Sequence, residues 1–396
     1  MQTEISTSIR IADLKPTAIN TILGEVRSAR AQGRNIVSLM RGEPDFPTPP
    51  HIVQAAITAL TNGRTSYPEN RGESALREAV AGKLTRDNRL TYDPASEILI
   101  TDGATFGIYA ALMSLLGPGD EILVPDPIYD AYQSPIRLAG AESRRVISSR
   151  TQGGRFQLTI EALEAAYTPA TRALLLNTPW NPVGTVFTES ELMQIADFVL
   201  RRNLILISDE IYEAITYDHH TYISPAVLSP EIRNRCILIN SLSKTYSMTG
   251  WRLGYCAAPE HLIKPMLLIL QQSSRGPATF IQDAGAAALS GPQHCVAQMR
   301  AVYGERRQQV TEALRGLQTI DVLAPEGGFF TMLDVSRLGR SSDEVRRHLL
   351  HQSGVAVVHG SAYGQSGEGT LRVSFATGGD TLTRGLQLLR EGLLSL

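Results

Sequence analysis

Short aliphatic runs alternate with amphipathic stretches through the middle of the chain. Three of these stretches have a helical pattern, Asp102–Leu116, Tyr129–Leu138 and Thr188–Arg201, and in the last Thr188 and Glu191 form a capping box. Runs that are aliphatic throughout and lead into a polar residue are typical of strands in a parallel sheet covered on both faces. Strands alternating with helices in this way predict an α/β domain. The strand-like runs are Glu97–Ile100, Glu121–Val124, Ala173–Leu176, Leu204–Ser208 and Ile237–Asn240.

The two ends of the chain have a different pattern. Pro50–Leu60 is predicted to be a helix, with Ile52, Val53, Ala56 and Leu60 on one stripe. The pattern predicts a large domain over residues 46–290, a small α+β domain over 291–396, and an N-terminal segment, 1–45, that packs on the small domain. The elements expected in the small domain are a helix from Gln293 to Leu317, a strand over Phe329–Leu333, a helix over Ser342–Gln352, strands over Val355–Val358 and Leu371–Phe375, and a final helix from Asp380.

Composition and charge narrow the class of protein. The chain has 396 residues, and a single core usually stops growing above roughly 250–300 residues, which also favours two domains. Lys plus Arg is 37 and Asp plus Glu is 39, so the net charge of -2 gives no basic footprint for nucleic acid or a membrane surface. The three cysteines lie far apart, with no zinc-type spacing, and the N-terminus lacks the apolar run of a signal peptide. We therefore expect a cytoplasmic protein without a metal site.

One lysine stands at the end of an aliphatic run. In Asn240-Ser241-Leu242-Ser243-Lys244 the predicted strand delivers two hydroxyls and an amine to its carboxyl end, where α/β sheets bind ligands. Arg252 follows eight residues later. Together these groups indicate an anchored phosphate beside an amine, and the alternative is a surface lysine in a serine-rich loop.

Two further predicted strands end in polar side chains. Asp209, in Ser208-Asp209-Glu210-Ile211-Tyr212, could hold a protonated ring nitrogen, and Tyr212 could bond the same ligand; the alternative for Asp209 is a helix N-cap. Asn181 offers a donor and an acceptor in a proline-bounded loop, which could also be a plain turn.

Two weaker signals complete the candidate site. Thr101-Asp102-Gly103-Ala104-Thr105 passes from a strand through Gly103 into a helix, whose free N–H groups could bind phosphate. Arg372 lies inside an apolar strand of the small domain, where it is either paired structurally or presented to a ligand carboxylate.

Taken in order, these segments resemble the fold-type I, pyridoxal-phosphate-dependent aminotransferases of class I and II. The resemblance extends over nearly the whole chain and implies a mostly parallel seven-stranded sheet between helices, with a smaller α+β domain. The matching segments are Gly42-Glu43-Pro44-Asp45-Phe46, Tyr67 with Asn70-Arg71-Gly72, Gly103-Ala104-Thr105, Asn181-Pro182-Val183-Gly184, Asp209-Glu210-Ile211-Tyr212, Ser241-Leu242-Ser243-Lys244, Gly250-Trp251-Arg252-Leu253-Gly254, and Arg372.

The resemblance implies a role for each residue around the cofactor ring. Lys244 looks like the lysine that binds the cofactor covalently, and Asp209 like the partner of the ring nitrogen. Asn181 and Tyr212 look like hydrogen-bonding partners of the ring oxygen, and Tyr129 like the aromatic side chain that stacks on the ring. Lys244, Asp209 and Tyr212 are the residues that we expect to be catalytic.

The resemblance also assigns the phosphate and the substrate carboxylate. Arg372, with Asn181 and Gly42, looks like the clamp for the α-carboxylate, and Tyr67 would reach the phosphate of a neighbouring subunit, which implies a homodimer with shared sites. The other residues expected around the phosphate are Gly103, Ala104, Thr105, Ser241, Ser243 and Arg252.

The chemistry of this family suits these residue types. The ring takes up the electrons left when an amino acid loses its α-proton, and it does so only while its nitrogen stays protonated. A buried carboxylate at Asp209 would favour the cationic ring nitrogen, and cations near Lys244, such as Arg252, would favour the neutral amine of a general base.

The substrate stays open between aspartate-like, aromatic and basic amino acids. The lysine that some aspartate enzymes carry after the glycine-rich turn is absent, since Ala104 and Thr105 occupy that stretch. Arg41 and Arg275 are possible substitutes, unless they are solvated or interface arginines, and Phe106 and Tyr109 could form an apolar wall unless they are core residues. The alternatives in activity are a pyridoxal-phosphate-dependent lyase or cyclase on the same fold, and a non-catalytic regulator that binds the cofactor.

Overall fold

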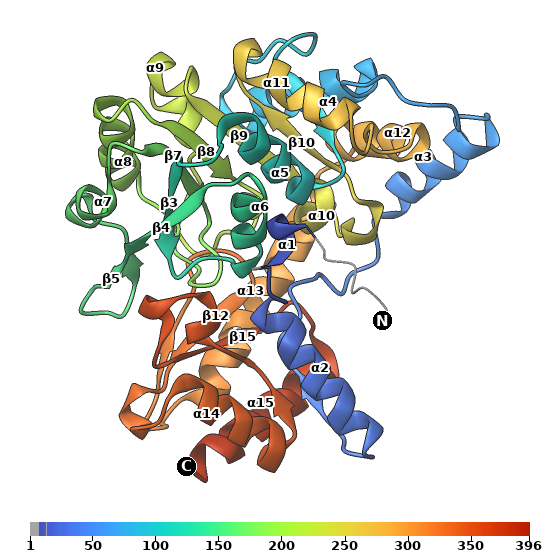
Figure 1. Ribbon diagram of the computed structural model, residues 1–396. Coiled ribbons are helices and arrows are strands. Elements are labelled where there is room, and N and C mark those ends of the chain that lie inside the picture. Colours follow the sequence, from blue (N-terminus) through green and yellow to red (C-terminus); the bar gives the residue numbers. More distant parts are fainter. Residues whose placement is uncertain (1–7, 13) are drawn as a thin grey trace, which may run out of the picture.

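Two β-sheets organise the protein, one in the upper and one in the lower half of Figure 1. The computed structural model describes residues 8–12 and 14–396. Residues 1–7 and 13, which belong to the predicted N-terminal segment, lie outside the described residues.

The upper sheet has seven strands, and its central strands are apolar on both faces. Along the sheet the order is β2 (Ile98–Thr101), β10 (Gly254–Ala257), β9 (Cys236–Ser241), β8 (Ile205–Asp209), β7 (Thr171–Asn177), β3 (Glu121–Asp126) and β4 (Glu142–Ile147). Neighbouring strands run parallel from β9 to β4, whereas β10 is antiparallel to both of its neighbours. The predicted mostly parallel sheet is therefore confirmed, as a mixed sheet with one reversed strand.

Helices cover both faces of this sheet because successive side chains of each strand point to opposite faces. In β7, Leu174 and Leu176 pack into one hydrophobic cluster, and Ala173 and Leu175 into another. The first cluster is shared with α4 (Ser74–Asn88), α8 (Glu189–Arg201) and α12 (Thr279–Ser290), and the second with α5 (Ala104–Leu115), α6 (Gln133–Leu138) and α11 (Glu260–Gln271).

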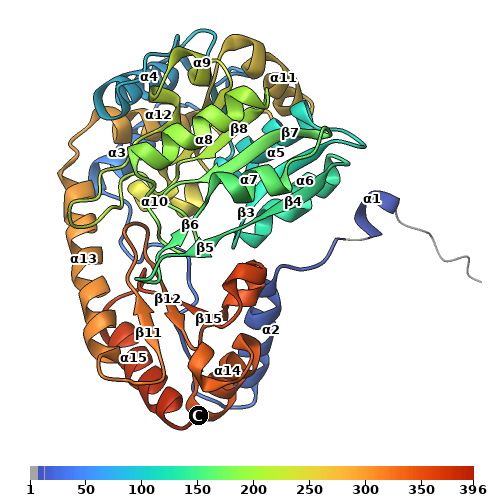
Figure 2. The same ribbon diagram turned by 90° about the vertical axis from the view of Figure 1, so that its left-hand side faces the viewer.

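The lower sheet is antiparallel and has four strands. Their order is β11 (Asp321–Leu323), β12 (Phe330–Asp334), β15 (Thr370–Ser374) and β14 (Val358–His359). Helix α13 (His294–Leu314) runs along one side of the molecule from the upper sheet to the lower one, as Figure 2 shows. The helices beside the lower sheet include α2 (Ala18–Ala31), α14 (Ser342–His348) and α15 (Gly379–Leu394).

The remaining elements are short, except for α3 (Pro50–Thr61), which packs on α12. Strand β1 (Val37–Ser38) pairs in parallel with β13 (Val355–Ala356), which brings the N-terminal part of the chain to the lower half. The others are α1 (Ile9–Ala12), the hairpin of β5 (Ser149–Arg150) and β6 (Phe156–Gln157), α7 (Ile160–Ala166), α9 (Pro230–Arg233) and α10 (Leu242–Thr245).

Most predicted elements are confirmed to within a few residues, and two are corrected. The capping box on α8 is present, with the Glu191 amide donating to Thr188 Oγ1 at 3.2 Å. The single strand predicted over Val355–Val358 is wrong, because the chain leaves β1 after Ala356 and joins the lower sheet at Val358. The helix predicted from Tyr129 begins instead with a 3-10 turn, Asp130–Tyr132, before α6.

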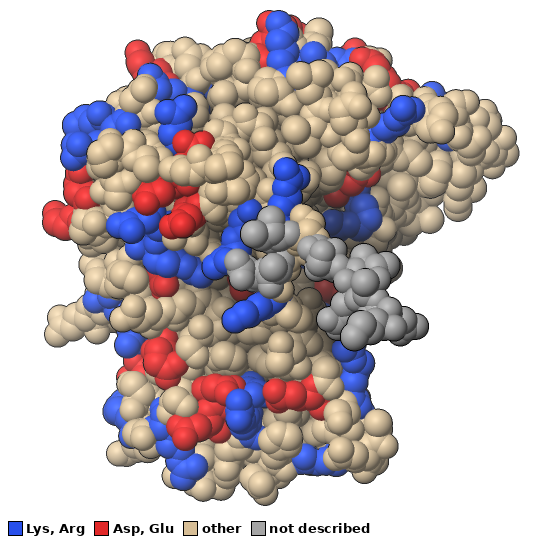
Figure 3. Space-filling model, viewed as in Figure 1, with Lys and Arg blue, Asp and Glu red and all other residues tan. Residues whose placement is uncertain are grey.

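Basic and acidic side chains are interspersed over the face shown in Figure 3. This mixture matches the near balance of charges in the sequence. Among the described residues, no helix combines the length and the apolar character needed to cross a membrane.

Candidate active site

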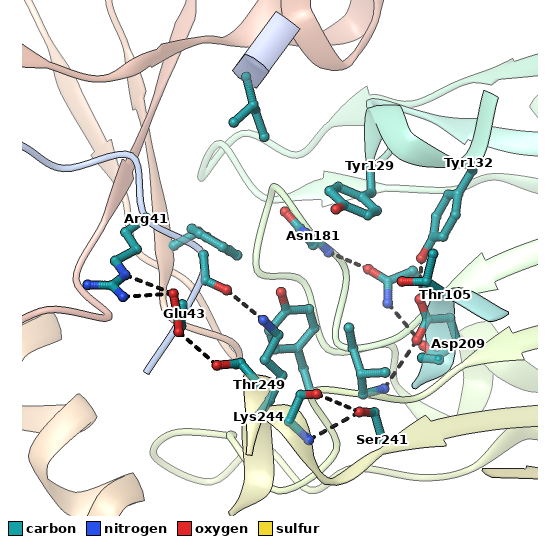
Figure 4. A pocket seen from close by; sticks show the side chains of 18 of the residues that line it. Arg41, Glu43, Thr105, Tyr129, Tyr132, Asn181, Asp209, Ser241, Lys244 and Thr249 are labelled. Atoms are coloured by element: carbon teal, nitrogen blue, oxygen red, sulfur yellow. Dashed lines mark hydrogen bonds and ion pairs between the residues drawn. The ribbon is translucent and has the colours of Figure 1, made fainter. Parts of the chain in front are cut away.

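A cavity of about 580 Å³ lies where the carboxyl ends of β7, β8 and β9 face the strands of the lower sheet. This edge of the upper sheet is where α/β proteins bind ligands, because the strand ends present free polar groups there. The cavity brings together residues from nine separate segments of the chain, and Figure 4 shows several of their side chains pointing toward one another. The predicted site residues that line it are Gly42, Ala104, Thr105, Tyr129, Asn181, Asp209, Tyr212, Ser241, Ser243, Lys244, Arg252 and Arg372.

Lys244 lies near the middle of the cavity, on the one-turn helix α10 that follows β9. Its Nζ donates a hydrogen bond to the carbonyl oxygen of Gly42 at 2.5 Å. Burial lowers the pKa of Lys244 to about 8; Arg252 and Arg372 lower it further, but the charges of Glu43 and Asp209, which raise it, have the larger effect. The lowered pKa expected from nearby cations is therefore present, but loss of hydration is its main cause.

Asp209 ends β8 and is 1% exposed. Its Oδ2 accepts the hydroxyl hydrogen bond of Tyr132, and its Oδ1 accepts the amide of Ile211 at 3.3 Å. Burial raises the pKa of Asp209 to about 6, against the opposing effects of Tyr132, Ile211 and Lys244. The helix-cap interpretation of Asp209 is wrong, since the chain continues from it into turns.

Asn181 is positioned by the neighbouring strand end. The Asn177 side chain donates to the carbonyl oxygen of Asp209 at 3.0 Å and accepts the backbone amide of Asn181 at 2.8 Å. The loop after β7 is therefore tied to the end of β8, and more than a plain turn holds Asn181 at the cavity wall.

Two serines and an arginine form a polar cup beside the start of α5. Ser241 Oγ and Ser243 Oγ are 2.8 Å apart, and Arg252 donates to the carbonyl oxygen of Thr249 at 3.1 Å. Gly103 has a φ of +78°, and a Cβ there would lie 2.8 Å from Arg252 Nη2, so only glycine allows the helix start to approach the guanidinium this closely. The free N–H groups at a helix start attract an anion, as the guanidinium does.

Arg372 is buried on β15 and reaches the cavity from the lower sheet. Its Nη2 donates to the carbonyl oxygen of Met40 at 3.0 Å and its Nη1 to Asn181 Oδ1 at 3.4 Å, while its Cζ lies 4.1 Å from the centre of the Phe330 ring. Its Nε is buried and has no hydrogen-bond partner among the described residues. A fixed guanidinium with a donor left over is suited to bind a carboxylate.

Several lining residues were not predicted from the sequence. Tyr132 was expected to be an ordinary helix residue, and the only signal in the sequence is its spacing of three from Tyr129. Glu43, in the Gly42-Glu43-Pro44 segment, accepts the Thr249 hydroxyl at 2.7 Å, which lowers the pKa of the Glu43 carboxyl.

Other candidates lie outside the cavity or are already paired. Arg41 is paired with Glu43 at 2.8 Å at the cavity mouth. Phe106 packs against a hydrophobic cluster with Tyr109 beside it, and neither is among the described residues that line the cavity. Tyr67 is 85% exposed and away from the cavity, with the Arg275 Cζ 5.7 Å from its ring centre.

Comparisons with known proteins agree with this site. Residues 34–387 match the family described as aminotransferase class I and II. The chain is 37% identical to a probable aspartate/prephenate aminotransferase of Aquifex aeolicus, over 97% of this chain and 98% of the relative. It is 39% identical to aromatic-amino-acid aminotransferase 2 of Thermococcus litoralis, over 92% and 93%. The solved structure of aspartate aminotransferase from Thermus thermophilus with maleate superposes with a TM-score of 0.91 at 32% identity, covering 98% of this chain and 100% of that one. The chain therefore belongs to the class I and II aminotransferase family and is a pyridoxal-phosphate-dependent aminotransferase.

Proposed function

We propose that the chain moves the amino group of an aspartate-like or aromatic L-amino acid to a 2-oxo acid at this cavity. The observation that carries the proposal is the convergence of one amine, one buried carboxylate and two guanidinium groups, Lys244, Asp209, Arg252 and Arg372, on a single cavity. Each group suits one part of an amino acid bound to the cofactor.

The residues present fit pyridoxal phosphate. Ser241, Ser243 and Arg252 form a cup that suits the phosphate of this cofactor, and Gly103 lets the start of α5 lie close beside it. The buried carboxylate of Asp209 suits the ring nitrogen. When bound, the cofactor supplies a cationic ring that takes up electrons from the substrate α-carbon. Tyr129, Asn181 and Tyr212 line the space between these two ends and would contact the ring.

Lys244 would transfer the proton, and Arg372 would bind the substrate. Lys244 would hold the cofactor at rest, and its freed Nζ, neutral above a pKa of about 8, would take the proton from the substrate α-carbon. Arg372 would bind the α-carboxylate through two donors and so fix the direction of the bond that loses the proton. The aromatic contacts of the guanidinium would keep it in place during turnover.

The choice of aspartate-like and aromatic donors rests on the relatives and on the cavity wall. The relatives named above are described as acting on aspartate, prephenate or aromatic amino acids. Ile19 and Leu23 of α2, with Phe330, give the cavity an apolar side suited to an aromatic side chain. Arg41 could meet a second carboxylate only by exchanging or sharing its partner Glu43.

A panel of amino acids tests this proposal. Each would be added to the holoenzyme without an oxo acid, and loss of the visible cofactor band would report amino transfer. We expect aspartate and the aromatic amino acids to act fastest, and Lys244→Ala to have no such band and no turnover. A fast response to lysine or ornithine alone, or wild-type turnover by Lys244→Ala, would contradict the proposal.

We further propose a homodimer in a reducing cytoplasm. Tyr67 is exposed, and Val53, Ile57 and Leu60 on α3 expose an apolar stripe, as expected for a surface that a second copy covers. The three cysteines are unpaired. If Tyr67 completes the partner's site, mixing and refolding the inactive variants Tyr67→Ala and Lys244→Ala should restore activity, because a mixed dimer has one intact site.

A further inference from the structure

A buried tyrosine contacts the carboxylate at the floor of the cavity. The hydroxyl of Tyr132 donates to Asp209 Oδ2, across 77 residues of sequence, and both side chains are about 2% exposed or less. Tyr132 is held by the 3-10 turn Asp130–Tyr132 and by an edge-to-face contact with Tyr129 at 5.4 Å. The pair is visible at the right of Figure 4.

The Tyr132 hydroxyl is the stronger of the two donors that Asp209 has among the described residues. The other donor, the amide of Ile211, lies at 3.3 Å, near the limit for a hydrogen bond. Four other titratable groups among the described residues interact electrostatically with Asp209, and they come from four segments: Lys244, Tyr129, Tyr212 and Cys256. Of these four, Lys244 alone is a cation. Without Tyr132, the ionised carboxylate would keep only one weak hydrogen bond in a dry site.

We propose that Tyr132 is a positioning residue, whose hydroxyl keeps Asp209 ionised and aimed at the ring nitrogen of the cofactor. The proposal rests on the role proposed above for Asp209. A hydrogen bond to the charged form of a carboxyl group favours that form. Removing the donor would move the shared proton from the ring nitrogen toward Asp209, and the ring would take up electrons less well.

The test uses the holoenzyme of Tyr132→Phe. We expect kcat to fall about tenfold or more, the effect of losing one hydrogen bond to a charged group, with a small change in KM. The pH midpoint of the visible cofactor band should rise, because a positive ring nitrogen disfavours the proton on Lys244 Nζ. With ¹⁵N-labelled cofactor, the ring-nitrogen resonance should move toward its unprotonated position.

Tyr255→Phe is the matched control. Tyr255, on β10, is likewise a buried tyrosine, and its hydroxyl has no hydrogen-bond partner among the described residues. We expect this variant to keep the wild-type midpoint, resonance and kcat. Equal shifts in both variants would mean that Tyr132 only packs, and would overturn the proposal.

Two further variants separate the possible failures. If Tyr132→Phe folds poorly, 3,5-difluorotyrosine at position 132 can replace it, because this residue keeps the ring and makes the hydroxyl a better donor. The pH midpoint of the visible cofactor band should then stay at or below the wild-type value. An increase in this midpoint would overturn the proposal. If Asp209→Ala loses turnover while Tyr132→Phe leaves all three measurements unchanged, the inference about Tyr132 fails and the role of Asp209 stands. If Asp209→Ala itself turns over normally, both fail.

Discussion

The guanidinium of Arg372 is fixed by the protein before any ligand binds. The Met40 carbonyl oxygen, the Asn181 side chain and the ring of Phe330 hold it, while Nε has no hydrogen-bond partner in the part of the chain that the structure describes. Lysine at this position would keep the charge and lose the planar fork. We expect Arg372→Lys to raise KM for the amino donor about 10- to 100-fold, equivalent to about 1.4–2.7 kcal/mol, with cofactor binding retained.

Steady-state kinetics and the visible cofactor band would measure these two effects together. Arg390→Lys is a control, because this arginine donates to the carbonyl oxygens of Ala313 and Arg315, at the far end of α13 from the cavity. An unchanged KM in Arg372→Lys would show that this arginine is structural only.

The buried amine of Lys244 should control how fast the apoprotein binds its cofactor covalently. Below a pKa of about 8 the amine is mostly protonated and cannot attack an aldehyde. The rate of appearance of the visible band should therefore rise about tenfold per pH unit up to about pH 8 and then level off, whereas free lysine side chains level off near pH 10.4. Glu43→Gln should move this midpoint down, because the charge of Glu43 raises the pKa of Lys244. A midpoint near 10 in the wild type would contradict the prediction.

Residues with their own sequence signal were predictable, and residues that act through distant contacts were not. Asp209, Lys244 and Arg372 each follow or interrupt an apolar run, and the cavity includes all three. Tyr132 carries no such signal, since its partner Asp209 is 77 residues away and only the packing of the strands brings the two together. The exposed pair of Arg41 with Glu43 could not be told from a solvated arginine by composition alone.

At the scale of elements, the turn from β2 into α5 lies close against Arg252 in the cup. Alanine at Gly103 would take a φ of +78° and would place its Cβ 2.8 Å from Arg252 Nη2. We expect Gly103→Ala to weaken cofactor binding about tenfold or more, because the helix start and the guanidinium must move apart. Cofactor titration of the apoprotein, followed by fluorescence, would measure the change.

Gly119→Ala separates backbone strain from crowding at Arg252. Gly119 has a φ of +89°, but a Cβ there would meet no atom within 4 Å. Both substitutions should cost about 1–3 kcal/mol of stability, because both place alanine at a positive φ. Only Gly103→Ala should lose cofactor affinity, and equal losses would mean that the cup tolerates a methyl group.

The elements that the sequence predicted well have local causes. The aliphatic runs form the buried strands, and Thr188 with Glu191 starts α8 as a capping box does. Strands β4 and β10 were missed for opposite reasons: most side chains of β4, at the sheet edge, are outside the core, whereas β10, Gly254–Ala257, is short and gains its place only by pairing antiparallel with β2 and β9. Such pairing depends on the rest of the fold and leaves no periodic signal in four residues.

At the scale of the whole molecule, the cavity depends on how the two sheets are held together. Arg155 donates to Glu326 at 2.8 Å, before β12, and to Glu191 at 2.7 Å, on α8. The Glu326 carboxylate also accepts the Val186 amide at 2.8 Å, and its own backbone amide donates to Gly184. The Asn181–Val186 loop is thus tied to the lower sheet. We propose that this junction joins two domains, 46–290 and 291–396, and that the N-terminal residues from α2 to β1 pack on the second.

Glu326→Gln should therefore disturb substrate binding as well as stability. The ion pair is mostly buried, with side-chain exposures of 24% for Arg155 and 16% for Glu326. Loss of the Glu326 charge should lower the free energy of unfolding by about 1–3 kcal/mol, measured by urea denaturation. This value lies between those of surface ion pairs and fully buried ion pairs, because the pair is partly buried. The exposed Arg201–Asp197 pair is a control, and Asp197→Asn should cost less than about 0.5 kcal/mol.

Because Asn181 in this loop binds Arg372, we also expect KM for the amino donor to rise in Glu326→Gln and not in Asp197→Asn. If stability fell and KM did not, the junction would hold the domains together without setting the geometry of the carboxylate clamp.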